Sequence, residues 1–198
     1  MPAGKQSGAR SESRHPSLDD RFDPAIRIVD HDPEWRRSAA AELGRIAKRL
    51  GPIAARLEHV GSTAVPGLAA KAIIELQLSV PDIQQQDAYV EPLTTLGYLF
   101  APDPDSPDYH FFAKPPQRPR THHLHVCQLG SEAERRHLAV RDFLRHDHRQ
   151  AADYAAFKRE FADRARGDRL AYIEGKDAYM TELETRALTW AQTEGRLP

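Results

Sequence analysis

The chain contains a single cysteine, no long apolar run and no excess of charge of either sign. Cys127 has no second cysteine with which to form an internal disulfide, so a reducing cytoplasm is the expected location. The longest apolar stretch, residues 69–78, is interrupted by Lys71 and Glu75 and is far shorter than the roughly 20 residues that cross a bilayer. The N-terminal residues lack the charged-then-apolar pattern of a signal peptide. We therefore expect a cytoplasmic protein with no membrane partner.

The charges nearly cancel, with 28 lysine and arginine residues against 29 aspartate and glutamate residues. No overall field attracts nucleic acid, so a nucleic-acid partner is not expected. A chain of 198 residues, 40% of them hydrophobic, suits one domain with a substantial core. Residues 1–21 are rich in Gly, Ser, Arg, Asp and Pro without an apolar period, which predicts a disordered leader. Residues 22–198 are predicted to form the single domain.

The apolar pattern predicts an α/β (α+β) fold, in which a mixed sheet is flanked by helices and the C-terminal half is helical. Predicted strands cover residues 26–29, 53–60, 72–80, 98–100, 109–113 and 122–129. Predicted helices cover residues 33–50, 82–96, 132–146, 151–165 and 176–192. Asp32 is expected to cap the first helix, and Ser131 with Glu134 matches a capping box for the third. The basic, proline-rich residues 114–121 are expected to join the last two strands as a hairpin.

A tight turn and a nearby acid occur together early in the chain. Gly61 and Ser62 follow a predicted strand directly, and the next strand carries Glu75 and Gln77. Because a strand alternates faces, these last two side chains point the same way. Small backbone, a hydroxyl and a carboxylate in this order suit a phosphate group accompanied by a divalent cation. The alternative is a plain tight turn, with Glu75 forming a salt bridge to Lys71.

These residues, with others along the chain, resemble the GrpB family, which has a nucleotidyltransferase-like fold. The resemblance runs from about Ile26 to Trp190, and its most specific part is the block from Gly61 to Lys71. The other matching segments are residues 32–35, 58–60, 73–75, 96–98, 111–114, 123–126 and 141–145, with the pairs Tyr154/Lys158 and Tyr172/Lys176.

The resemblance implies that Gly61 and Ser62 hold the phosphates of a nucleotide, while acids on the next strand hold Mg²⁺ or Mn²⁺ for transfer of a nucleotidyl group to a small acceptor. In this chain Gln77 brings no charge, and Glu75 stands where the family usually has aspartate. Both differences weaken a two-metal mechanism. The family also occurs fused to dephospho-CoA kinase, which implies a second possibility: a non-catalytic accessory module with a protein partner.

His123 and His125 lie two residues apart on a predicted strand and therefore share a face. They are expected to face Glu75 across the sheet, and we predict these three as the catalytic residues, with the histidines as acid or base at near-neutral pH. Two alternatives stay open. The pair could form a facial site with Glu75 for zinc, iron or manganese, or it could be a hydrogen-bonded pair on a half-buried face. His59 could join the same pocket, whereas His137 is predicted to be a surface residue.

Several basic residues are predicted to bind an anionic substrate together with Gly61 and Ser62. They are Lys71, Lys114, Arg141 and Lys158, with Lys176 as a further candidate. Charged residues four apart on a helix are most often exposed, so a plain surface role is the alternative. The leading prediction is an enzyme that binds a phosphorylated or nucleotide ligand with Mg²⁺ or Mn²⁺. Its predicted metal ligands are Glu75 and Gln77.

Overall fold

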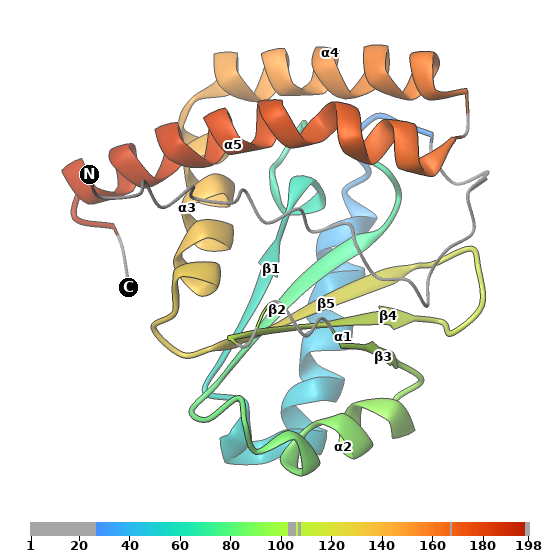
Figure 1. Cartoon of the computed structure of the whole chain (residues 1–198), viewed down its shortest axis with the longest axis vertical. Helices are drawn as coiled ribbons and strands as arrows, with labels where there is room; N and C mark the ends of the chain where they lie inside the picture. Colours follow the sequence, from blue (N-terminus) through green and yellow to red (C-terminus); the bar gives the residue numbers. More distant parts are fainter. Residues whose placement is uncertain (1–26, 103–105, 107, 167, 197–198) are drawn as a thin grey trace, which may run out of the picture.

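The computed structural model describes residues 27–102, 106, 108–166 and 168–196, and within them one mixed sheet is flanked by helices (Figure 1). The strands are β1 (Arg56–Val60), β2 (Ile74–Val80), β3 (Leu99–Ala101), β4 (Tyr109–Lys114) and β5 (His122–Gln128). The α-helices are α1 (Glu34–Leu50), α2 (Val90–Thr95), α3 (Glu132–His146), α4 (His148–Ala165) and α5 (Arg169–Thr193). The predicted fold class is confirmed. The predicted leader, residues 1–21, lies outside the described residues.

The strands follow the order β1-β2-β5-β4-β3, so β5 occupies the centre and β2 lies beside it in the interior of the sheet. Only β2 and β5 run parallel, and β4 and β5 form the predicted antiparallel hairpin. In the parallel pair Glu75 lies beside His123, and Gln77 lies beside His125. Partners in register share a face, so all four side chains point to the same side of the sheet.

The opposite face of the sheet carries the main core. The apolar side chains at even-numbered positions of β2 and β5 are buried there, together with residues of α1 and α2. The α1 stripe predicted from helical spacing packs on them, with Ala39, Ile46 and Leu50 buried. The first helix begins one residue later than predicted, but Asp32 still caps it, because its carboxylate accepts a hydrogen bond from the Glu34 amide at 2.9 Å.

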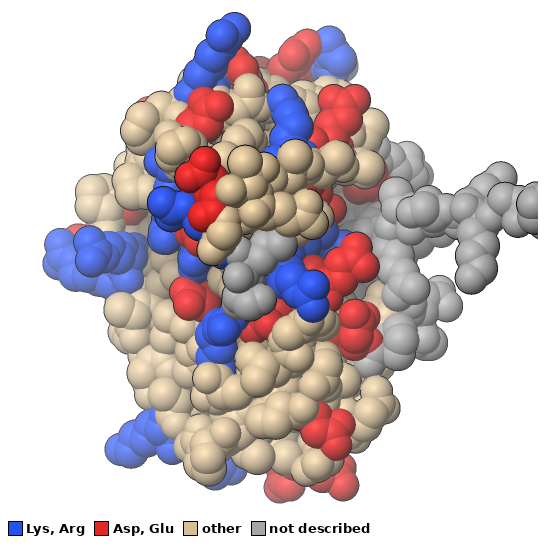
Figure 2. Space-filling model, turned by 90° about the vertical axis from the view of Figure 1, so that its left-hand side faces the viewer, with Lys and Arg blue, Asp and Glu red and all other residues tan. Residues whose placement is uncertain are grey.

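The C-terminal helices build the other side of the molecule. Helix α3 packs against β1, β2 and β5, and α4 and α5 run side by side across one end of the sheet (Figure 1). The predicted cap of α3 is confirmed on the serine side, since Ser131 Oγ accepts from the Glu134 amide at 3.2 Å. On the face seen in Figure 2, positive and negative side chains of the described residues are interspersed and form no broad field of one sign.

Three predicted elements differ in the structure. The strand expected at residues 26–29 is a single bridge between Val29 and Ala70. The helix expected from Asp82 is replaced by a turn, because the Asp82 carboxylate accepts from the Gln84 amide at 2.9 Å, and α2 starts only at Val90. Helix α5 begins seven residues earlier than predicted. None of the described helices has the length and apolar character needed to cross a bilayer.

Candidate functional site

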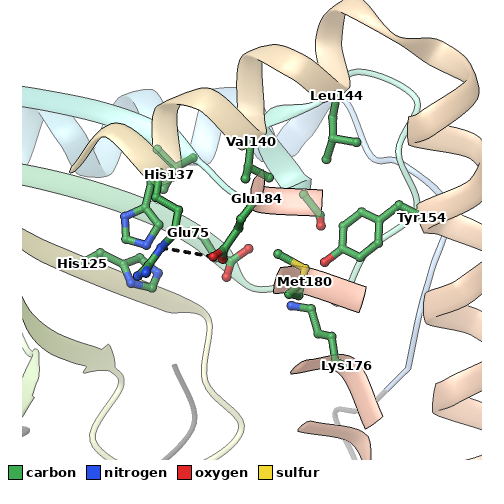
Figure 3. A pocket seen from close by; sticks show the side chains of 13 residues that line it. Glu75, His125, His137, Val140, Leu144, Tyr154, Lys176, Met180 and Glu184 are labelled. Carbon is green, nitrogen blue, oxygen red and sulfur yellow. Dashed lines mark ion pairs between the residues drawn. The ribbon is translucent and has the colours of Figure 1, made fainter. Parts of the chain in front are cut away.

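A cavity of about 50 Å³ lies where the ends of β1, β2 and β5 meet α3, α4 and α5 (Figure 3). Its polar lining comprises Gly61, Ser62, Glu75, His125, Arg136, His137, Tyr154, Lys176 and Glu184. Apolar walls come from Val60, Val140, Leu144 and Met180. Pockets for drug-sized ligands measure about 300–1,000 Å³, so this cavity suits a small group such as a phosphate rather than a whole nucleotide.

Gly61 brings the turn into direct contact with the acid. Its φ of 67° and ψ of −168° belong to a region open only to glycine. A Cβ atom at this position would lie 2.0 Å from Glu75 Oε2 and 2.9 Å from Glu75 Cβ. The Glu75 side chain therefore packs on the bare Gly61 backbone, and the next residue, Ser62, lines the same cavity. The predicted grouping of Gly61, Ser62 and Glu75 is present.

Ser62 is held by a lysine from a distant helix. Lys158 Nζ donates a hydrogen bond to Ser62 Oγ at 2.8 Å and lies 4.2 Å from the centre of the Tyr154 ring. Lys158 is only 3% exposed, and in the described part of the chain no carboxylate lies within ion-pair distance of it. Burial lowers the pKa of Lys158 well below its ordinary value, and the charges of Lys176 and Lys71 lower it further, while Glu75 opposes them.

The remaining groups at this end of the cavity are Tyr154 and Lys176 (Figure 3). Tyr154 is buried, and burial raises the pKa of its hydroxyl, while the charge of Lys176 and hydrogen bonds to Lys176 and Ser62 counteract the rise. Lys176 Nζ lies 5.9 Å from the centre of the Tyr154 ring. Lys71 lies near this cluster but outside the lining, with its ammonium 5.4 Å from the Tyr172 ring centre.

At the other end of the cavity His125 lies beside His137 (Figure 3), whereas His123 is not among the lining residues. The rings of His125 and His137 have centres 4.7 Å apart. His125 Nδ1 contacts the Tyr109 hydroxyl at 2.7 Å, while the His123 ring packs against Phe111. The surface role predicted for His137 is wrong. Its position one turn before Val140 and two turns before Leu144, both lining residues of α3, is the signal that sequence reasoning missed.

Gln77 points to the predicted face but is fully buried beneath α3. Its amide oxygen lies 3.0 Å from His137 Nδ1, and its amide nitrogen donates to Ser79 Oγ at 3.4 Å. Ser79 in turn donates to Glu134 at 2.6 Å. Both ends of the Gln77 amide are therefore engaged, one of them by the lining residue His137, and Gln77 itself does not line the cavity.

The described residues do not assemble a metal centre from His, Cys, Asp or Glu side chains alone. Among them there is no group of three or more His, Cys, Asp or Glu side chains arranged to hold a metal ion. Glu184, the second acid in the cavity, forms an ion pair with Arg136, with Oε2 and Nε 3.6 Å apart. The facial site considered for Glu75, His123 and His125 is accordingly not assembled.

Two predicted anion ligands are engaged outside the cavity. Lys114 lies on the opposite face of the sheet, where its ammonium is 2.7 Å from Glu42 Oε1. Arg141 donates to Glu58 Oε2 at 2.7 Å and also bonds Asp142, so it fastens α3 to β1. Its neighbour one turn later, Arg145, donates twice to the Ala64 carbonyl, at 2.8 and 3.0 Å. Arg141 and Arg145 thus fix α3 to β1 and to the segment that follows Ser62.

The chain is similar in sequence and in overall structure to several known proteins. The family model described as GrpB protein matches residues 25–186. A UPF0157 protein of Pseudomonas aeruginosa is 41% identical over 169 residues, covering 84% of this chain and 69% of that protein. A Mycolicibacterium paratuberculosis protein named dephospho-CoA kinase is 33% identical, and the match covers 87% of this chain and 48%, about half, of that protein. The crystal structure of conserved protein GrpB from Enterococcus faecalis matches with a TM-score of 0.78 at 29% identity, covering 84% of this chain and 99% of that one.

Proposed function

The chain belongs to the GrpB family, and on this basis we propose that it binds the phosphate of a small phosphorylated ligand, such as a nucleotide, in the cavity beside Ser62. The observation that carries the proposal is that Ser62, at a turn made sharp by Gly61, is hydrogen-bonded to Lys158 and lines the same cavity as Lys176. Hydroxyl and ammonium groups are strong donors to phosphate oxygens.

The electrostatics of this end of the cavity support an anionic ligand. The positive charges of Lys176 and Lys71 both act on Lys158, and Glu75 is the acid that acts on Lys158 in the opposite sense. A phosphate dianion would offset this accumulation of positive charge. The small volume of the cavity supports entry of the phosphate alone, with the remainder of the ligand outside.

The residues do not fit the predicted two-metal clamp of a nucleotidyltransferase. Glu75 reaches the cavity, but Gln77 is uncharged, buried and bonded to His137 and Ser79. Two magnesium ions need more than one available carboxylate beside the phosphates, and the second acid of the cavity, Glu184, is paired with Arg136. The proposed function is therefore phosphate binding, without metal-dependent nucleotidyl transfer.

Isothermal titration calorimetry tests the proposal, with pyrophosphate, ATP and dephospho-CoA as separate titrants. We expect binding of at least one titrant, weakened about tenfold or more by Lys176→Gln because a charge-assisted hydrogen bond is lost. Lys48→Gln removes an exposed lysine of α1 and should leave the affinity unchanged. Absence of binding to all three, or equal affinity in Lys176→Gln, would contradict the proposal.

A second candidate function is an accessory module for another protein. It is favoured by the match to proteins named dephospho-CoA kinase, of which this region makes up about half. Sedimentation of this chain mixed with the unmatched half of such a protein tests it. A complex that survives Glu75→Ala would support the module, and separate sedimentation of the two proteins would contradict it.

A further inference from the structure

Ser62 and Lys158 have the geometry of a nucleophile and its base. The Nζ–Oγ distance is 2.8 Å, within the range at which a base takes the proton of a hydroxyl. Gly61, in its glycine-only conformation, places Ser62 at a sharp corner directly after β1, with the cavity beside it. A serine presented on such a corner is open to an electrophile from one side.

A lysine acts as a base only when its amine is neutral, and the surroundings of Lys158 favour the neutral form. The side chain is 3% exposed, and no carboxylate of the described chain lies within ion-pair distance. Burial and the charges of Lys176, Lys71 and Arg159 lower its pKa. Glu75 and the Tyr154 ring favour the charged form, but the effect of Glu75 is smaller than that of burial and that of Lys176, and the net shift is downward.

We propose that Ser62 and Lys158 form a nucleophile–base pair that accepts a phosphoryl group from a bound phosphate ester. This inference rests on the proposed phosphate site and adds a covalent step to it. Lys176, which lines the cavity, holds the phosphoryl oxygens, while Lys158 lies behind Ser62 and outside the lining. The two amines thus have separate roles, one in binding and one in proton transfer.

The reaction sequence balances with water as the second reactant. The Ser62 oxygen bonds to phosphorus as the ester P–O bond breaks, and the hydroxyl proton passes to Lys158 Nζ. The departing ester oxygen lies on the far side of phosphorus from Ser62, so it takes a proton from water and leaves as an alcohol, and the protonated amine returns its proton to Ser62 when the phosphoserine is hydrolysed. Water hydrolyses the phosphoserine, which restores Ser62 and releases inorganic phosphate. An anion in the cavity raises the proton affinity of Lys158, so ligand binding itself favours removal of the Ser62 proton.

A fluorophosphonate, which phosphonylates activated serines, is the probe for this pair. We expect one adduct per chain on the peptide that contains Ser62, found by mass spectrometry, and none in Ser62→Ala. Lys158→Met and Lys158→Arg should each slow labelling about a hundredfold or more, because neither side chain can act as a base. The arginine of Lys158→Arg can still donate hydrogen bonds and carry a positive charge. Slow labelling of this variant would therefore show that Lys158 is needed for proton transfer and not only for binding. Lys48→Gln should react at the wild-type rate.

The pH dependence of the wild-type rate keeps the test decisive where a Lys158 variant does not fold. Labelling should rise with pH and reach its plateau well below the pH at which ordinary lysines titrate, because the neutral amine is the active form. Labelling of a residue other than Ser62, or labelling of folded Lys158→Arg at the wild-type rate, would overturn the proposal that Ser62 and Lys158 act as nucleophile and base. Pyrophosphate binding without phosphonylation would also overturn it, yet leave the proposed function intact.

Discussion

Lys114 Nζ lies 2.7 Å from Glu42 Oε1, so a largely buried ion pair joins the last residue of β4 to α1 on the face opposite the cavity. Burial opposes the charged form of Glu42, but the hydrogen bond and charge of Lys114 prevail and lower the pKa of Glu42. The stability from this shift is present above the pKa of an unfolded glutamate and is lost as the pH falls through the lower folded value.

We predict that Glu42→Gln lowers the free energy of unfolding at neutral pH by about 2 kcal/mol, because Lys114 loses its charged partner in a buried place. Urea unfolding measures the change. Glu34→Gln, which removes an acid of the exposed pair with Arg37, serves as control and should cost less than about 0.5 kcal/mol. Equal effects of the two substitutions would contradict a structural role for the buried pair.

Gly61→Ala tests the contact between the turn and Glu75. The new Cβ would collide with the carboxylate and occupy a conformation reserved for glycine, so we expect a loss of about 3 kcal/mol or more in unfolding free energy. Gly67→Ala is the matched control, because Gly67 also has a positive φ but a Cβ added there would meet no atom within 4 Å. It should cost only about 1 kcal/mol, and comparable losses would argue against the Glu75 contact.

His59 should make the fold sensitive to mild acid. Burial, followed by the charges of Arg145 and Arg141, lowers the pKa of His59 to about 4. The unfolded chain takes up this proton near pH 6.5 and the folded chain only near pH 4, so stability falls as the pH drops between these values, by up to about 3 kcal/mol. His59→Gln should make the unfolding free energy nearly independent of pH over this range. His148→Gln, at an exposed position, should leave the pH dependence unchanged.

Gly175→Ala is predicted to destabilise the protein although alanine favours helices more than glycine. A Cβ at Gly175, within α5, would lie 2.1 Å from the Phe161 ring of α4, and such overpacking costs about 1–3 kcal/mol. Gly44→Ala, in α1 and free of neighbours within 4 Å, should instead stabilise by about 1 kcal/mol. Thermal unfolding measures both. A stabilising Gly175→Ala would show that the two helices are not packed this closely.

Local chemistry predicts much of this fold, because hairpins and caps depend on neighbouring residues. The β4–β5 hairpin and the Ser131 cap are of this kind. Strand alternation also predicts that Gln77 shares a face with Glu75. The same alternation does not reveal that α3 covers Gln77 and brings His137 against it, since that depends on tertiary packing.

Local patterns also did not predict on which face of the sheet Lys114 lies. It is set by the register of β4 against β5, in which Lys114 pairs with His122 rather than with a residue of the cavity face. The turn at Ser62 could be predicted from its own residues, whereas its link to Lys158 required the packing of α4.

Ser62 and its partner Lys158 are 96 residues apart in the chain, and Lys176 follows later still. Protein synthesis proceeds at roughly 5–20 residues per second, so the turn leaves the ribosome about 5–20 s before the lysine that completes it. During that interval the nascent sheet has the serine but no amine beside it. The growing chain therefore acquires its charged cavity only after α4 and α5 have been synthesised, and a ligand can stabilise the folded domain without trapping forms that lack these helices.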